Sequence, residues 1–162
     1  MSSSLLGTIR FIAVCFVSVV FLFAGICKLT PALHPDTFYD LDNKFRGPYI
    51  KIIQNVLTNV LKRKYAVEPV TFKNGVGIAE LFSILLIWTG FGQIGGSCLA
   101  AIMAGACYVH ISLKEDYVFP AVLGGLSLLI SWLSIRKPGN PRPPRVGKPL
   151  RPETNSPRNK SK

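Results

Sequence analysis

Long runs of apolar residues dominate the chain, and shorter polar stretches separate them. Four of these runs are predicted to form membrane-spanning helices, at residues 7–29, 74–90, 94–113 and 117–135. Their lengths are close to the roughly 20 apolar residues that a helix needs to cross the hydrocarbon core of a bilayer. The pattern therefore predicts an all-α membrane protein whose four-helix transmembrane domain occupies residues 1–137.

The first apolar run could instead be a cleaved signal peptide. Its uncharged core at residues 11–26 is long for a signal sequence, and the residues from Ala24 to Cys27 form a poor cleavage site. We therefore expect a retained helix that ends near Pro31, because proline stops helices.

The polar connection at residues 30–73 is predicted to contain two helices. Asp36 is a suitable N-cap for a short helix through about Phe45, and Gly47-Pro48 should break it. Beyond the break, apolar residues recur at helical spacing at Ile50, Ile53, Leu57, Val60 and Leu61. This spacing predicts an amphipathic helix, placed either flat on the membrane or against the bundle.

The last segment, residues 138–162, is rich in Pro, Arg, Lys, Asn and Ser and is predicted to be disordered, because it cannot bury a core. Much of the net charge of +11 lies there. The segment contains no aromatic residue on which a nucleic-acid base could stack, so we expect no nucleic-acid partner. Basic residues beside a membrane span instead indicate attraction to anionic membrane lipid.

Three ionisable residues are predicted to lie at similar depth within the apolar runs: Lys28, Glu80 and His110. A charge in the middle of a bilayer costs at least ~2.5 kcal/mol, so such residues usually face the bundle interior and find a partner. Glu80 is the natural counter-ion of Lys28, and His110 could bond to either residue. Two interpretations remain open: an ion pair that fixes helix register, or a ligand or proton site.

Small residues recur at a spacing of four along the third run. One row contains Gly96, Ala100 and Ala104, and a second row beside it contains Ser97, Ala101 and Gly105. Small residues at this spacing let helix backbones approach closely in lipid. The row predicts either packing within the bundle or an interface with a partner protein.

No catalytic or metal site is expected. The four cysteines form no CxxC pair and are interpreted as small packing residues. The acidic residues at 36, 40, 42, 115 and 116 are interpreted as solvated helix or turn surface.

Four segments of the chain resemble DoxX-like membrane proteins, and among these the transmembrane protein 35 family of nicotinic acetylcholine receptor chaperones (the NACHO family). The first is the run from Phe23 to Pro31, which ends in Lys-Leu-Thr-Pro. The others are Gly77–Leu81, Tyr108–His110 and Ile135–Pro138. The resemblance as a whole covers roughly residues 8–138, with similar spacing throughout.

This resemblance implies a DoxX-like four-helix fold in the endoplasmic reticulum membrane, with both termini in the cytosol and residues 30–73 in the lumen. It implies a chaperone without catalytic activity or cofactor, whose partners are nicotinic acetylcholine receptor subunits. An alternative from the wider group is a quinone-linked oxidoreductase subunit. Arg158 and Lys160 also resemble a dibasic signal for retrieval to the reticulum.

Overall fold

A computed structural model describes residues 3–62 and 66–135 of the chain, and every regular element in these ranges is helical. The elements are α1 (Ser3–Leu29), α2 (Pro35–Lys44), the π-helical segment η1 (Phe45–Tyr49), α3 (Ile50–Leu61), α4 (Pro69–Trp88), α5 (Gly92–Leu113) and α6 (Val118–Ile135). The predicted all-α class is confirmed for the described residues.

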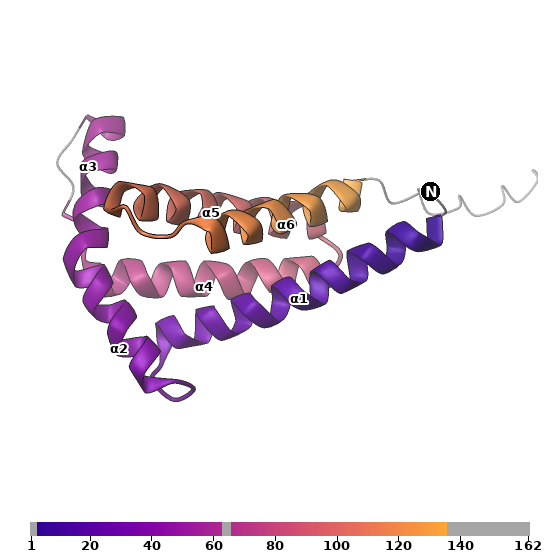
Figure 1. The fold of residues 1–162 in the computed structure, drawn as a ribbon, viewed down its shortest axis with the longest axis horizontal. Helices are drawn as coiled ribbons and strands as arrows, with labels where there is room; N and C mark the ends of the chain where they lie inside the picture. The colour runs from indigo at the N-terminus through magenta and orange to yellow at the C-terminus, as the bar shows by residue number, and fades with distance from the viewer. Residues whose placement is uncertain (1–2, 63–65, 136–162) are drawn as a thin grey trace, which may run out of the picture.

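Four of the helices, α1, α4, α5 and α6, are long and apolar enough to cross a membrane. They run side by side in Figure 1, where α4 packs against α1 and α5, and α6 packs against α5 and α1. The start of α1 and the end of α6 lie at the same end of the bundle. These features support the prediction of a multi-pass membrane protein, with four candidate spanning helices in the part of the chain that the structure describes.

The bundle is apolar both in its centre and on its outer surface, as expected of a protein surrounded by lipid. Its centre holds apolar side chains that are almost fully buried, including Val17, Phe21, Leu99 and Ile130. Equally apolar side chains point outward, such as Phe11, which is 62% exposed, and Val19, which is 68% exposed. Exposing so much apolar surface to water would cost free energy, whereas lipid tails are as apolar as these side chains and surround them without such a cost.

The remaining helices form a cap, which we define as α2, η1 and α3. In Figure 1 this cap stands across the end of the bundle opposite the start of α1. Gly47 has φ −101° and ψ −107°, so the chain bends there, next to Pro48, as the sequence pattern predicted. The α3 helix occupies the region of the predicted amphipathic helix. Its first residue, Ile50, is buried, while Val60 near its end is 70% exposed.

Two predicted helix starts are wrong, and capping explains both. The N-cap of α2 is His34 rather than Asp36, because the His34 ring accepts the backbone N–H of Thr37 and Pro35 occupies the first helical position. The α4 helix begins at Pro69 rather than Asn74, because the Glu68 carboxylate accepts backbone N–H groups of Val70 and Thr71. The hydropathy pattern does not predict these capping interactions, because they depend on individual polar side chains.

Candidate functional site

The α1 and α4 helices cross where each carries a glycine. A Cβ atom on Gly25 would lie 3.2 Å from the backbone oxygen of Gly77, and a Cβ on Gly77 would lie 3.1 Å from the backbone oxygen of Gly25. Both distances are shorter than ordinary van der Waals contact, so a Cβ at either position would require the facing backbone to shift by a few tenths of an ångström. The helices therefore approach closely enough for side chains beside the crossing to meet.

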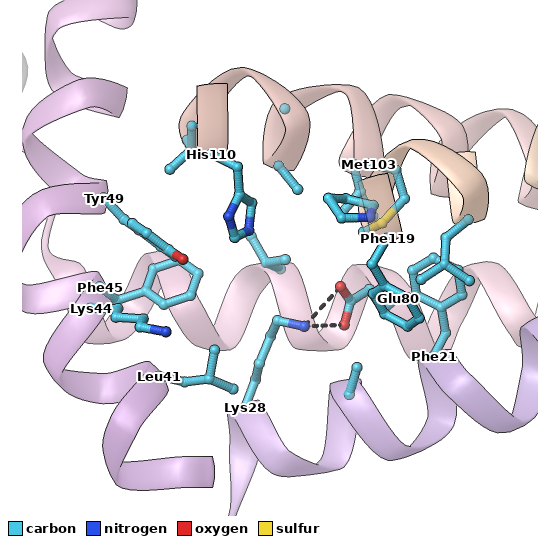
Figure 2. A pocket seen from close by; sticks show the side chains of 18 of the residues that line it. Phe21, Lys28, Leu41, Lys44, Phe45, Tyr49, Glu80, Met103, His110 and Phe119 are labelled. Atoms are coloured by element: carbon cyan, nitrogen blue, oxygen red, sulfur yellow. Dashed lines mark hydrogen bonds and ion pairs between the residues drawn. The ribbon is translucent and has the colours of Figure 1, made fainter. Parts of the chain in front are cut away.

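Lys28 and Glu80 meet at this crossing. The Nζ atom of Lys28 donates to both carboxylate oxygens of Glu80, at 2.9 Å to Oε1 and 2.7 Å to Oε2. Each residue lies three positions after the glycine of its own helix, and helical side chains lean toward their N-terminus. Because α1 and α4 run in opposite directions, the two side chains lean toward each other (Figure 2).

The pair is well shielded from solvent. The Glu80 side chain is 1% exposed and that of Lys28 is 12% exposed. In such surroundings neither charge is stable without the other, because a buried unpaired ion loses its hydration without compensation. The structure thus brings together the first two of the three ionisable residues singled out in the sequence.

His110 belongs to a different group, at the end of the bundle that the cap covers. Its Nδ1 atom lies 2.9 Å from Oε2 of Glu115, without the alignment of a hydrogen bond, and the same oxygen accepts a bond of 3.3 Å from the Tyr49 hydroxyl. The Tyr49 and His110 rings pack edge to face with centroids 5.9 Å apart. Among the described residues His110 has no bond to Lys28 or Glu80, contrary to one expectation from the sequence.

Tyr49 takes part in this second group from the cap. Burial, together with the charge of Glu115 and the hydrogen bond to it, raises the pKa of the Tyr49 hydroxyl to about 12. The hydroxyl therefore remains a proton donor to Glu115 at any physiological pH. Glu115 was expected to be solvated turn surface, but its carboxylate joins the cap to the end of α5.

A third polar contact, missed by the sequence analysis, holds the cap against α4. The Lys73 side chain is 1% exposed, and its Nζ atom lies 2.6 Å from Oδ1 of Asp42 and 3.9 Å above the ring of Phe38. Arg46 binds the other oxygen of Asp42 at 2.7 Å. Hydrogen bonds from Lys73 and then Arg46 hold the pKa of Asp42 below its ordinary value.

The interpretation of Asp42 as solvated surface is therefore wrong. A signal was present in the sequence: Lys73 stands within the first turns of an apolar helix, where a cation needs a partner. Its partner is 31 positions away in the chain, on a helix whose placement the local pattern does not reveal.

A cavity of about 570 Å³ lies between the cap and the four long helices. Its wall is mostly apolar and aromatic and includes Phe21, Phe45, Phe72 and Met103. Lys28, Glu80, Tyr49 and His110 also line it, so two of the three polar groups border the same space (Figure 2). This volume is in the range of pockets that hold small organic ligands.

The small residues of α5 are divided between two environments. Gly96 and Ala100 are buried, and a Cβ on Gly96 would lie 2.7 Å from the backbone oxygen of Ser127 on α6. Ala104 and Gly105 are exposed, as are Ser97 and Ala101. Gly96 and Ser97 contact α6, Ser97 through a hydrogen bond of 2.9 Å to Ser131, whereas Ala101 and Gly105 line the cavity described above.

The remaining residues singled out in the sequence carry no further site in the described ranges. The four cysteines are free thiols, and only Cys27 is fully buried. Within the described residues, 3–62 and 66–135, no three metal-ligating side chains lie close enough together to bind a metal ion. Arg158 and Lys160 lie outside the described residues.

The chain was compared with protein-family models, curated proteins and solved structures. No family model, no curated protein and no solved structure matches the chain.

Proposed function

We propose that this protein is a non-enzymatic membrane chaperone of the endoplasmic reticulum that assists the assembly of nicotinic acetylcholine receptors or related ligand-gated channels. The observation that carries the proposal is the crossing of α1 and α4. The two segments that resemble the transmembrane protein 35 family there, one ending in Lys28-Leu29-Thr30-Pro31 and the other at Gly77–Leu81, pack as one unit. The resemblance therefore involves residues that form a single three-dimensional feature.

The outward face of α5 supports an interaction with another membrane helix. Ser97 and Ala104 are exposed there and have small side chains, whereas Ala101 and Gly105, although exposed, line the cavity. A receptor helix could approach this surface closely, with its backbone near that of α5. The proposed orientation, with both termini in the cytosol, places the cap in the lumen, where the extracellular domains of a receptor subunit fold.

The proposal is tested by co-expressing receptor subunits with this protein in cells that lack their own assembly factor. We expect the amount of assembled receptor at the cell surface to rise, and proximity labelling from this protein to mark receptor subunits. Unchanged surface receptor across several subunit combinations, with normal amounts of this protein, would contradict the proposal.

A matched pair of variants tests the α5 face. Ala104→Phe places a bulky ring on the exposed small-residue surface, whereas Ala79→Phe places the same ring on the exposed face of α4. We expect Ala104→Phe to reduce receptor assembly and Ala79→Phe to leave it near the parent level. Equal activity of the two variants would exclude the α5 face as the contact surface.

The quinone-linked alternative predicts a different result for the purified protein. An oxidoreductase subunit would oxidise or reduce an added quinone couple, and its optical spectrum would report any redox group that copurifies. A chaperone should show neither property while still raising surface receptor.

A further inference from the structure

We propose that the cavity between the cap and the bundle binds a lipid alcohol, meaning a membrane amphiphile with an apolar body and a hydroxyl head. The apolar body occupies the aromatic part of the cavity, and the hydroxyl bonds to the Lys28–Glu80 pair. The inference goes beyond the proposed chaperone function, since receptor assembly does not require a bound small molecule.

The size and wall of the cavity define the body of the ligand. A space of about 570 Å³ is within the range of pockets that enclose drug-sized molecules. Phe21, Phe45 and Phe72 come from three different elements and meet around it, so an apolar body gains dispersion contacts on several sides. A strongly polar molecule of the same size would lose its hydration without replacement.

The ion pair defines the head group. Lys28 has three N–H donors, and two of its bonds go to the carboxylate of Glu80. One donor remains, and the Glu80 carboxylate retains acceptor positions that Lys28 does not occupy. A hydroxyl uses both, because its oxygen accepts from Lys28 while its proton is donated to Glu80.

The charges around the cavity disfavour an anionic head. An anion beside Lys28 would also lie beside Glu80, so the attraction of one is largely cancelled by the repulsion of the other. Lys44 lines the cavity from α2, but its Nζ atom is paired with Asp40 at 3.1 Å. On the α5 side His110 adjoins the carboxylate of Glu115. The cationic and ring-nitrogen groups at the wall thus each have an acidic neighbour.

The test is photo-crosslinking of the purified full-length protein in lipid nanodiscs. The probe is a long-chain alcohol that carries a diazirine and an alkyne, and the comparison probe is the alkyl sulfonate of the same chain. We expect the alcohol to label peptides of the cavity wall in α1, α4 and α5, and excess unlabelled alcohol to abolish this labelling. The sulfonate should label about tenfold less, which corresponds to about 1.4 kcal/mol of preference.

A matched pair of variants separates the cavity from the lipid-facing surface. Ala24 lines the cavity at a spacing of four from both Val20 and Lys28, so Ala24→Phe fills part of the space. Ala121 is exposed on α6 and does not line the cavity, so Ala121→Phe adds the same ring outside it. We expect labelling to fall about tenfold in the first variant and to stay at the parent level in the second.

Three labelling results would overturn the proposal. These are equal labelling by the alcohol and the sulfonate, undiminished labelling of Ala24→Phe, and insertion confined to outward-facing residues. A thermal-shift measurement shows whether each variant is folded and whether it binds the alcohol. The alcohol should raise the melting temperature of the parent and of Ala121→Phe but not that of a folded Ala24→Phe, and a shift in all three would also contradict the cavity site. Receptor assembly is measured separately, so failure here leaves the chaperone proposal untouched.

Discussion

Gly25 of α1 and Gly77 of α4 pack backbone against backbone, and this contact lets Lys28 reach Glu80. Gly77 has Lys28 and Leu29 around the position where a Cβ would be, so its environment is closed on several sides. A Cβ alone would require these neighbours to shift by a few tenths of an ångström, and a larger side chain would separate the two helices further. The ion pair would then lose its short bonds as well.

Replacement of Gly77 should therefore destabilise the protein. We expect Gly77→Leu to lower the free energy of unfolding by about 1–3 kcal/mol, which is the typical cost of inserting extra methylene groups into a well-packed core. Gly75→Leu is the matched control, because a Cβ at Gly75 on the same helix meets nothing within 4 Å. Thermal unfolding in detergent, followed by size-exclusion chromatography, measures both variants. Equal melting temperatures would show that the close crossing does not contribute to stability.

The ion pair should behave as a unit in a double-mutant cycle. Glu80→Gln or Lys28→Met alone leaves one charge buried without a partner, which typically costs about 3–5 kcal/mol. The double variant should recover part of this loss, because no unpaired charge remains. The amount of folded protein and its thermal stability measure the cycle, with receptor assembly assayed in parallel.

Activity of the double variant then distinguishes the two interpretations of the pair. A folded and active double variant indicates a structural pair, whereas a folded but inactive one indicates contact with a client or ligand. If both single variants match the parent in abundance and activity, the pair contributes to neither stability nor function.

The contact between Asp42 and Lys73 should make attachment of the cap depend on pH. Because the pKa of Asp42 is lowered in the folded protein, its carboxylate stabilises the fold fully above its ordinary pKa of 3.8. This contribution is lost as the pH falls through the lower pKa of the folded state. We expect the stability difference between the parent and Asp42→Asn to be present at pH 6 and to shrink below pH ~4.

Melting temperatures of the two proteins across this pH range test the prediction. Asp36→Asn is the control, because Asp36 is exposed on the same helix and the structure shows no ion pair for it among the described residues. This variant should follow the pH profile of the parent. A constant difference between the parent and Asp42→Asn down to pH ~3 would refute the assigned role of Asp42.

The proposed orientation predicts which sites receive glycans. The sequence Asn159-Lys160-Ser161 is an acceptor for N-glycosylation but lies in the segment assigned to the cytosol. It should remain unmodified, whereas an acceptor engineered near Asn43 in α2 should gain a glycan. Mobility shifts that disappear on endoglycosidase treatment report both. A glycan on Asn159 would reverse the orientation.

Local properties of the sequence were sufficient to predict the class and the main elements of the fold. An apolar run of membrane-spanning length indicates a helix wherever it lies, because lipid leaves the backbone no other way to satisfy its hydrogen bonds. The bend at Gly47-Pro48 is equally local, since it depends on the backbone preferences of those two residues. The proximity of Lys28 and Glu80 followed from depth alone, as two opposite charges in an apolar layer have few other partners.

Tertiary structure decided which groups meet wherever several partners were available. His110 could have joined Lys28 or Glu80, but the cap places Tyr49 and Glu115 beside it instead. Asp42 and Lys73 are ordinary charged residues in their own segments, and they become an ion pair because α2 lies across the end of the bundle, where Asp42 reaches Lys73 of α4. The cavity depends on the crossing angles of all these helices at once. The hydropathy pattern predicts how deep in the membrane a residue lies. The direction in which its side chain points, and the residues that it contacts, depend on how the helices cross.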